Sequence, residues 1–430
     1  MDVRNVLVFP AGTEIGLEIY HALKFCKEVK VFGAGQAVSN HAEFAYPQYH
    51  VIPNIHEADW LPRLVDLCRE LSIDYIFPAY DDIVLALSRE QQHIPAAIIS
   101  SPLQTCEITR SKMDTYARLA DIVRVPHVYP HADLVARYPV FVKPDRGQGS
   151  FGAKKIHGRI ELDAALSEVP GSIICEYLPG EEYTVDCFSD RERGLLFAGA
   201  RSRRRTRNGI SVNTHTENID EASMLAEKIG ARLGLRGAWF FQLKRAESGD
   251  LVLLEVAPRI AGAMATHRVM GVNFPLLSIF EHERLPLSVL LNPGEIELDR
   301  ALSNRYRHQI SFDTAYIDLD DTLLLRDKVN VSLVKLIYQC RNQGKCVKLI
   351  TRHAGDLERT LDIHRLSGMF DEVIHLRQRE KKSAYIPERT AIFIDDSFAE
   401  RRDVVEVCGI PTFDCSMIEL LSDAMEAMQG

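Results

Sequence analysis

The sequence contains no apolar run long enough to cross a membrane. It has nine cysteines but no C-x-x-C pair, so it indicates neither a zinc site nor a disulfide framework. The formal net charge of −9 excludes the overall basic surface that is typical of nucleic-acid binding. The first residues lead directly into a strand-then-glycine pattern, so we do not expect a secretory leader. We therefore expect a cytoplasmic protein with no membrane and no nucleic-acid partner.

What the sequence does contain is three stretches of different character. Its 430 residues, 46% apolar and 26% charged, suffice for roughly two to four structural units. Residues 1–105 alternate apolar runs with helical patterns, which predicts α/β structure with a parallel sheet. Residues 106–300 hold closely spaced strand patterns, which predict an α+β layout with a largely antiparallel sheet. Residues 301–312 carry no clear pattern and are expected to be a linker. The α/β rhythm returns over residues 313–430.

A glycine-rich stretch follows one of the middle strands. In "PVFVKPDRGQGSFGAKKI" the strand ends at Lys143, and Gly147, Gly149 and Ser150 come next. Glycines let backbone N–H groups approach phosphate oxygens, and a lysine adds a positive charge. A solvent-exposed turn is the alternative interpretation of such a loop.

Acidic and amide residues also interrupt the apolar strands further on. Glu176 ends the strand "SIICE", and Glu182 begins the next one. Gln242 and Glu255 lie in two strands joined by the polar turn "ESGD", so we expect them to meet on one face of a hairpin. A buried acid is costly unless it is paired or bound to a metal, and oxygen ligands of this kind suit Mg²⁺.

Together these segments resemble the ATP-grasp superfamily, in particular its carbamoyl-phosphate-synthase-like branch. The resemblance covers roughly residues 1–300 and implies a small α/β domain at 1–105, an ATP-grasp domain at 106–300, and the binding of ATP and Mg²⁺. By residue, it implies Lys112 and Lys143 at the ATP phosphates; Gly147, Gly149 and Ser150 in a lid over them; Glu176, Tyr177 and Leu178 at the adenine; Glu182 near the ribose; Gln242 and Glu255 as metal ligands; and Arg259 as a catalytic arginine.

One position departs from the family pattern. ATP-grasp proteins usually have an asparagine two residues after the metal-binding glutamate, whereas "EVAPR" has Ala257 there. Alanine supplies no side-chain oxygen, so one metal site lacks a ligand. This leaves two alternatives open: an active ligase, or a domain that only binds nucleotide or substrate.

A dense run of arginines, "ARSRRRTRNG", lies beside an expected strand end. Arginine binds carboxylates and phosphates through two parallel hydrogen bonds, so Arg201, Arg203 and Arg205 are candidates for binding an anionic substrate. The alternatives are a solvated basic loop or a patch for an acidic partner.

The last stretch ends its apolar strands in polar residues. "YIDLDD" supplies Asp318 and Asp320, "CVKLIT" supplies Thr351, and "AIFIDDS" supplies a further pair of aspartates. Lys381 and Lys382 stand at the start of an expected helix. Because the carboxyl ends of parallel strands gather at one edge of a sheet, we expect these groups to form a site.

These motifs resemble the haloacid-dehalogenase superfamily over residues 313–430, with a doubly wound, Rossmann-like fold. The resemblance implies a phosphatase with the following roles: Asp318 as nucleophile, Asp320 as general acid and base, Thr351 as phosphate ligand, Lys382 (alternatively Lys381) as the charge-balancing lysine, and Mg²⁺ held by Asp318, Asp320, Asp395 and Asp396. The intervals between the motifs leave no room for a cap domain. We therefore expect the preceding part of the chain or a neighbouring subunit to cover this site.

The combined prediction is a bifunctional enzyme. An ATP- and Mg²⁺-dependent ligase would join a small carboxylate to an amine or thiol through an acyl phosphate, and the Mg²⁺-dependent phosphatase would act on the same small metabolite, in its phosphorylated form. The alternatives are a phosphatase whose first part only binds substrate or nucleotide, and a non-catalytic nucleotide sensor. A homodimer is expected from the resemblance alone.

Overall fold

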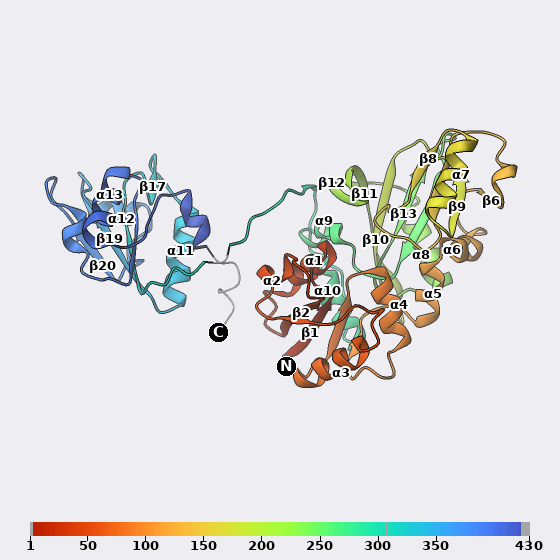
Figure 1. Ribbon diagram of the computed structural model, residues 1–430, viewed down its shortest axis with the longest axis horizontal. Coiled ribbons are helices and arrows are strands. Elements are labelled where there is room, and N and C mark those ends of the chain that lie inside the picture. Colours follow the sequence, from red (N-terminus) through yellow and green to blue (C-terminus); the bar gives the residue numbers. More distant parts are fainter. Residues whose placement is uncertain (1–2, 307, 423–430) are drawn as a thin grey trace. The chain divides into compact units, whose positions relative to one another are not determined.

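The computed structural model describes residues 3–306 and 308–422, and the chain divides after Leu302 into two compact units (Figure 1). Each unit is described by itself. None of the helices in these described ranges combines the length and apolar character that crossing a membrane requires.

The first unit begins with a five-stranded sheet in the order β3-β2-β1-β4-β5. All of its strand pairs are parallel, as predicted. Its strands are β1 (Arg4–Phe9), β2 (Val29–Gly35), β3 (Tyr49–Val51), β4 (Tyr75–Pro78) and β5 (Ala97–Ile98). Helices α1 (Glu14–Leu23) and α10 (Phe274–His282) share a core with one face of this sheet, and α3 (Trp60–Glu70) and α4 (Asp81–Arg89) share a core with the other.

Side-chain alternation along β1 explains this layering. Val6 and Val8 point to the core shared with α1 and α10, whereas Leu7 and Phe9 point to the opposite core. The first of these cores also takes in Phe240 from the six-stranded sheet described next. The segments predicted as two domains, 1–105 and 106–300, therefore pack together within one unit.

The rest of the first unit is built on two antiparallel sheets, as predicted for this part of the chain. The smaller sheet has the order β6-β9-β7-β8, with β6 (Val128–Tyr129), β7 (Val140–Pro144), β8 (Lys154–Ile156) and β9 (Ser172–Glu176). The larger has the order β14-β13-β10-β11-β12-β15, with β10 (Glu182–Asp190), β11 (Gly194–Arg207), β12 (Ile210–Glu217), β13 (Gly237–Arg245), β14 (Leu251–Ala257) and β15 (Glu297–Asp299). Helices α6 (Lys112–Leu119) and α8 (Ala222–Leu233) pack on the larger sheet.

The second unit holds a parallel sheet in the order β20-β19-β16-β21-β22, which confirms the predicted doubly wound layout. Its strands are β16 (Thr314–Ile317), β19 (Cys346–Thr351), β20 (Glu372–His375), β21 (Ala391–Ile394) and β22 (Thr412–Phe413). Helices α11 (Val331–Asn342) and α12 (Leu357–Ile363) share a core with one face, and α13 (Phe398–Cys408) with the other. Only the hairpin of β17 (Leu324–Leu325) and β18 (Lys328–Val329) and helix α11 lie between β16 and β19, so this interval contains no cap domain.

Candidate active sites

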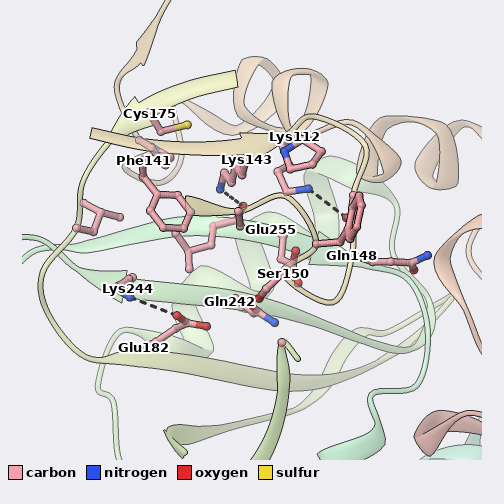
Figure 2. A pocket seen from close by; sticks show the side chains of 18 of the residues that line it. Lys112, Phe141, Lys143, Gln148, Ser150, Cys175, Glu182, Gln242, Lys244 and Glu255 are labelled. Atoms are coloured by element: carbon pink, nitrogen blue, oxygen red, sulfur yellow. Dashed lines mark hydrogen bonds and ion pairs between the residues drawn. The ribbon is translucent and has the colours of Figure 1, made fainter. Parts of the chain in front are cut away.

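A cavity in the first unit lies between the two antiparallel sheets (Figure 2). Every residue predicted to contact ATP or its metal lines it: Lys112, Lys143, Gly147, Gly149, Ser150, Glu176, Tyr177, Leu178, Glu182, Gln242 and Glu255. These residues come from α6, β7 and the loop after it, β9 and the segment after it, β10, β13 and β14. The fold thus gathers into one cavity a set that is spread over more than a hundred positions of the sequence.

Two lysines supply positive charge to this cavity. Lys143 is buried, and its Nζ donates to the Tyr116 hydroxyl at 2.7 Å, while that hydroxyl donates to the Leu254 carbonyl at 2.8 Å. Burial lowers the pKa of the Lys143 ammonium. Lys112 Nζ donates to the carbonyl oxygens of Asp145 and Gly147, at 3.2 and 3.3 Å. Neither lysine forms an ion pair within the described ranges, so both charges remain available to an anionic ligand such as a polyphosphate.

The glycine loop after β7 adopts the backbone that its composition allows. Gly149 and Ser150 have φ of +62° and +57°, in the left-handed region that glycine enters at little cost. Gln148 Oε1 accepts a hydrogen bond from the Asp81 backbone N–H at 3.1 Å, which ties the loop to the start of α4. The loop therefore spans from the cavity to α4, which packs against the first parallel sheet.

Oxygen ligands lie on the floor of the same cavity. Gln242 on β13 and Glu255 on β14 are register partners, which confirms the predicted hairpin. Neither side chain has a hydrogen-bond or ion-pair partner among the described residues, so their oxygens are free to bind a cation. Two oxygen donors beside two lysines fit Mg²⁺ carrying a polyphosphate. Ala257, the last residue of β14, adds no oxygen.

Two of the residues expected at the adenine and ribose, Glu176 and Glu182, are held by other protein groups. The Glu176 carboxylate accepts hydrogen bonds from the His127 backbone N–H at 3.0 Å and from Arg124 at 3.3 Å. Glu182 forms ion pairs with Arg203 Nε at 2.7 Å and with Lys244 Nζ at 3.4 Å. Glu176 thus contributes to the cavity wall with its carboxylate already engaged.

The arginine run is not a loop: it lies within β11, which extends to Arg207. Arg203 lines the cavity, but Arg201 and Arg205 do not. Arg201, 2% exposed, forms a bidentate pair with the fully buried Asp186 at 2.8 and 3.1 Å, and Asp186 also contacts His267 Nδ1 at 2.9 Å. Arg205 is exposed and pairs with Asp299 on the edge strand β15 at 2.7 Å. Of the three predicted substrate arginines, only Arg203 is placed to contact a molecule in this cavity.

Arg259 also lies away from the lining of this cavity. Its guanidinium binds the Asp81 carboxylate through two hydrogen bonds of 2.5 and 2.8 Å. Burial on its own would raise the pKa of Asp81, but the charge and hydrogen bonds of Arg259, together with the nearby charges of Arg110 and Lys112, lower it. The geometry thus favours a structural role for Arg259, linking the end of β14 to α4, over the catalytic role predicted for it.

In the second unit the predicted groups do gather at the carboxyl edge of the parallel sheet. Lys382 Nζ donates to Asp318 at 2.5 Å and to Asp395 at 2.7 Å, and all three are buried. Thr351, 1% exposed, ends β19 beside them. Lys381 instead pairs with Asp403 at 2.5 Å on the protein surface, so the structure distinguishes the two candidate lysines. The helix expected here is only a short 3-10 turn, Lys382–Tyr385.

The carboxylates of this second site are suited to a divalent cation. Oxygens of Asp318, Asp395 and Asp396 lie within 4.8 Å of one another. Burial raises the pKa of Asp318 to about 7, with Asp395 adding to the effect and Lys382 opposing it. Burial also raises the pKa of Asp395. The lysine alone leaves the cluster short of positive charge, which Mg²⁺ would supply.

Asp320 lies outside this cluster, although it was predicted as a further metal ligand. The strand ends at Ile317, and the chain turns through Asp321, whose φ is +56°, so Asp318 points inward while Asp320 is exposed. His353 Nδ1 lies 2.9 Å from the Asp320 carboxylate. The sequence interpretation missed His353, and its position two residues after Thr351 was the available signal.

The comparisons with known proteins identify the fold of the first unit. A family model described as "ATP-grasp in the biosynthetic pathway with Ter operon" matches residues 168–289. The chain is 24% identical over 145 residues to a D-alanine–D-alanine ligase of Fusobacterium nucleatum subsp. nucleatum. That match covers 31% of this chain and half the length of the ligase.

Solved structures give the same result. A biotin carboxylase from Campylobacter jejuni, in complex with an ATP analogue, superposes with a TM-score of 0.57 and 17% identity, covering 68% of this chain and 74% of the other. An L-amino acid ligase from Bacillus licheniformis superposes with a TM-score of 0.54 and 19% identity, covering 67% and 76% of the two chains. The protein therefore contains an ATP-grasp fold. The predicted haloacid-dehalogenase resemblance of the second unit stays a prediction.

Proposed function

We propose that the chain is a bifunctional enzyme in which an ATP-grasp ligase is fused to a phosphatase. The ligase would activate a small carboxylate as an acyl phosphate at the expense of ATP, and an amine or thiol would then attack it. A carboxylate oxygen is a poor leaving group and phosphate a good one, which is why the reaction needs ATP. The observation that carries this half is the joint placement of Lys112, Lys143, Gln242 and Glu255 around one cavity.

Each group in that cavity has a task suited to its chemistry. The two lysines offset the negative charge of the phosphates, and Gln242 and Glu255 would hold Mg²⁺, which stabilises charge on the transferring phosphoryl group. Arg203 is the one predicted arginine in position to contact an anionic substrate or phosphate. The relatives named a D-alanine–D-alanine ligase and an L-amino acid ligase support amino acids or similar small molecules as substrates.

The second half of the proposal is a phosphatase of the haloacid-dehalogenase type. It is supported by Asp318, Lys382 and Asp395 in direct contact, with Thr351 ending the adjacent strand. Asp318 would attack the phosphorus atom and form an aspartyl phosphate, which water then hydrolyses. Lys382 offsets the repulsion between the attacking carboxylate and the anionic substrate. Asp318, Asp395 and Asp396 would hold Mg²⁺, which supplies further positive charge.

Separate measurements test the two halves in the full-length chain. ADP release is followed with pairs of amino acids in the presence of Mg²⁺, and hydrolysis of p-nitrophenyl phosphate is followed without ATP. We expect Lys143→Ala to abolish the first activity and to leave the second, and Asp318→Asn to do the reverse. Loss of both activities in either variant, with the fold intact, would contradict two independent sites. Pairing of two copies stays a prediction.

A second candidate function is favoured by one observation, the alanine at position 257. If two metal ions are essential for acyl-phosphate formation, the first unit would only bind a nucleotide or substrate, and the phosphatase would be the sole activity. Nucleotide binding without ADP release under any substrate pair, together with Asp318-dependent phosphate release, would support this alternative.

A further inference from the structure

A histidine outside the predicted phosphatase motifs holds the carboxylate of Asp320. His353 Nδ1 lies 2.9 and 3.1 Å from the two carboxylate oxygens. The Asp320 side chain is 51% exposed and that of His353 17%, so a half-buried ring holds a carboxylate at the rim of the site. An exposed aspartate otherwise rotates freely, and this contact restricts it to one orientation.

The histidine is itself fixed from several sides. Its Nε2 lies 3.0 Å from the Thr360 hydroxyl, and its backbone N–H donates to the Thr351 hydroxyl at 3.1 Å. Its carbonyl oxygen contacts His375 Nε2 at 2.8 Å. The backbone contacts fix the residue beside the end of β19, and the ring cannot rotate without losing its contacts with Asp320 and Thr360.

This chain of contacts can serve Asp320 with and without a proton. When Asp320 is a carboxylate, Nδ1–H donates to it, and Nε2 accepts from the Thr360 hydroxyl. When Asp320 carries a proton on one oxygen, the same Nδ1–H still donates to the other oxygen, and Nε2 still accepts from the Thr360 hydroxyl. The contact with Nδ1–H is kept in both states, and the other oxygen of Asp320 is left to carry, give or take the proton.

We propose that His353 is a positioning residue that orients Asp320 for proton transfer in both steps of the phosphatase reaction. This inference rests on the proposed phosphatase function. In the first step a bond forms between Asp318 Oδ and phosphorus, and the bond from phosphorus to the ester oxygen breaks. The bonding pair goes to the ester oxygen, which takes the proton of Asp320 and leaves as an alcohol.

The second step restores the enzyme. Water attacks phosphorus and gives a proton to the Asp320 carboxylate, while the bond from phosphorus to Asp318 breaks and its electron pair returns to the Asp318 carboxylate. Asp320 must therefore be aimed correctly as an acid and then as a base. Because Nδ1–H donates to Asp320 in both states, the contact with His353 provides that in one geometry.

The test uses two aryl phosphates that differ in their need for a proton. Nitrophenolate leaves readily without protonation, whereas phenolate is more basic and leaves better when protonated. If His353 orients Asp320, His353→Ala should lower kcat/KM for phenyl phosphate about 100-fold. It should lower kcat/KM for p-nitrophenyl phosphate only about tenfold or less. Asp320→Asn should show the same difference between the two esters, because it removes the proton donor directly.

Further variants separate this role from a structural one. His353→Asn keeps an amide at the position of Nδ1 and should recover part of the activity on phenyl phosphate. His364→Ala, at the end of α12, controls for loss of an imidazole from the same region and should change neither ester. An equal loss on both esters in His353→Ala, or no loss, would overturn the proposal. Absence of hydrolysis by the wild-type chain would overturn the phosphatase function as well, so the two failures are distinguishable.

Discussion

Gln242 and Glu255 lie directly opposite one another on the antiparallel strands β13 and β14, and both side chains line the cavity that contains Lys143. Residues opposite in an antiparallel pair have Cβ atoms about 4.5–5.5 Å apart and share one face of the sheet. Two oxygen donors thus reach the same region of the cavity from a rigid support. This arrangement allows the cation site to be tested one residue at a time.

The first prediction concerns Glu255. Replacing it with glutamine keeps the shape but removes the negative charge, so we expect Mg²⁺-dependent ADP release to fall about 100-fold or more. Binding of ATP without Mg²⁺ should be nearly unchanged, since the lysines remain. Titration of a fluorescent ATP analogue with and without Mg²⁺ measures the difference. Asp250→Asn, an exposed acid in the turn before β14, is the control, and an equal effect of both variants would contradict the assignment.

Lys382 and Lys381 form a natural pair for the second prediction. Lys382→Met removes the cation between Asp318 and Asp395, so hydrolysis of p-nitrophenyl phosphate should fall by about 100-fold or more. Lys381→Met loses only a surface ion pair with Asp403, and its activity should stay within about twofold of wild type because such pairs contribute little. Steady-state kinetics compare the two. Loss of activity in Lys381→Met alone would mean that the geometry assigns the wrong lysine.

A third prediction follows from the pair Asp81–Arg259. The pKa of Asp81 is lowered in the folded protein, so the pair stabilises the fold above the unfolded pKa of about 3.9 and loses this contribution as the pH falls through the lower, folded value. Asp81→Asn should cost about 2–4 kcal/mol of unfolding free energy at pH 7. Urea unfolding between pH 7 and pH 3 should show this difference constant down to about pH 5 and shrinking below about pH 4. A difference that grows on acidification would have the wrong sign for this pair.

The buried pair Asp186–Arg201 gives a fourth prediction. Asp186→Asn leaves the Arg201 guanidinium buried without its counter-ion, and we expect a loss of about 3–5 kcal/mol in unfolding free energy. Arg205→Gln breaks an exposed pair and should cost less than about 1 kcal/mol. Denaturant titrations of both variants provide the measurement. If Asp186→Asn had normal stability but weakened substrate binding, the result would instead support a role for Arg201 in substrate binding.

Much of this molecule could be predicted from its sequence because the signals are local. Thr351 ends an apolar strand and Asp318 and Asp395 each directly follow one, and strands of one parallel sheet present their carboxyl ends at a common edge. The pairing of Gln242 with Glu255 followed from the short polar turn between their strands. In such cases spacing along the chain determines placement in space.

The structure adds partners that are not neighbours in the sequence. The density of the arginine run suggests a substrate role for Arg201, whereas Asp186 and His267 meet it only in the folded protein. Arg259 meets Asp81 across 178 positions. No local pattern reports such pairs, so a charged side chain that belongs to the interior looks the same in the sequence as one that binds a ligand.

The final prediction concerns Ala257, where a substitution can add an oxygen atom near Glu255. Ala257 ends β14 two residues after Glu255, so its side chain lies on the same face of the strand. An asparagine there would add a carbonyl oxygen beside Glu255, and we expect Ala257→Asn to lower the Mg²⁺ concentration needed for half-maximal ADP release by about tenfold, in line with an added oxygen ligand. Ala257→Leu has similar bulk without the oxygen and should not. The alanine is 7% exposed and part of a core, so thermal unfolding of both variants checks that packing is retained. A lower Mg²⁺ requirement in Ala257→Asn alone would show that the wild-type site works one ligand short. No change in the Mg²⁺ requirement would show that water already fills the position.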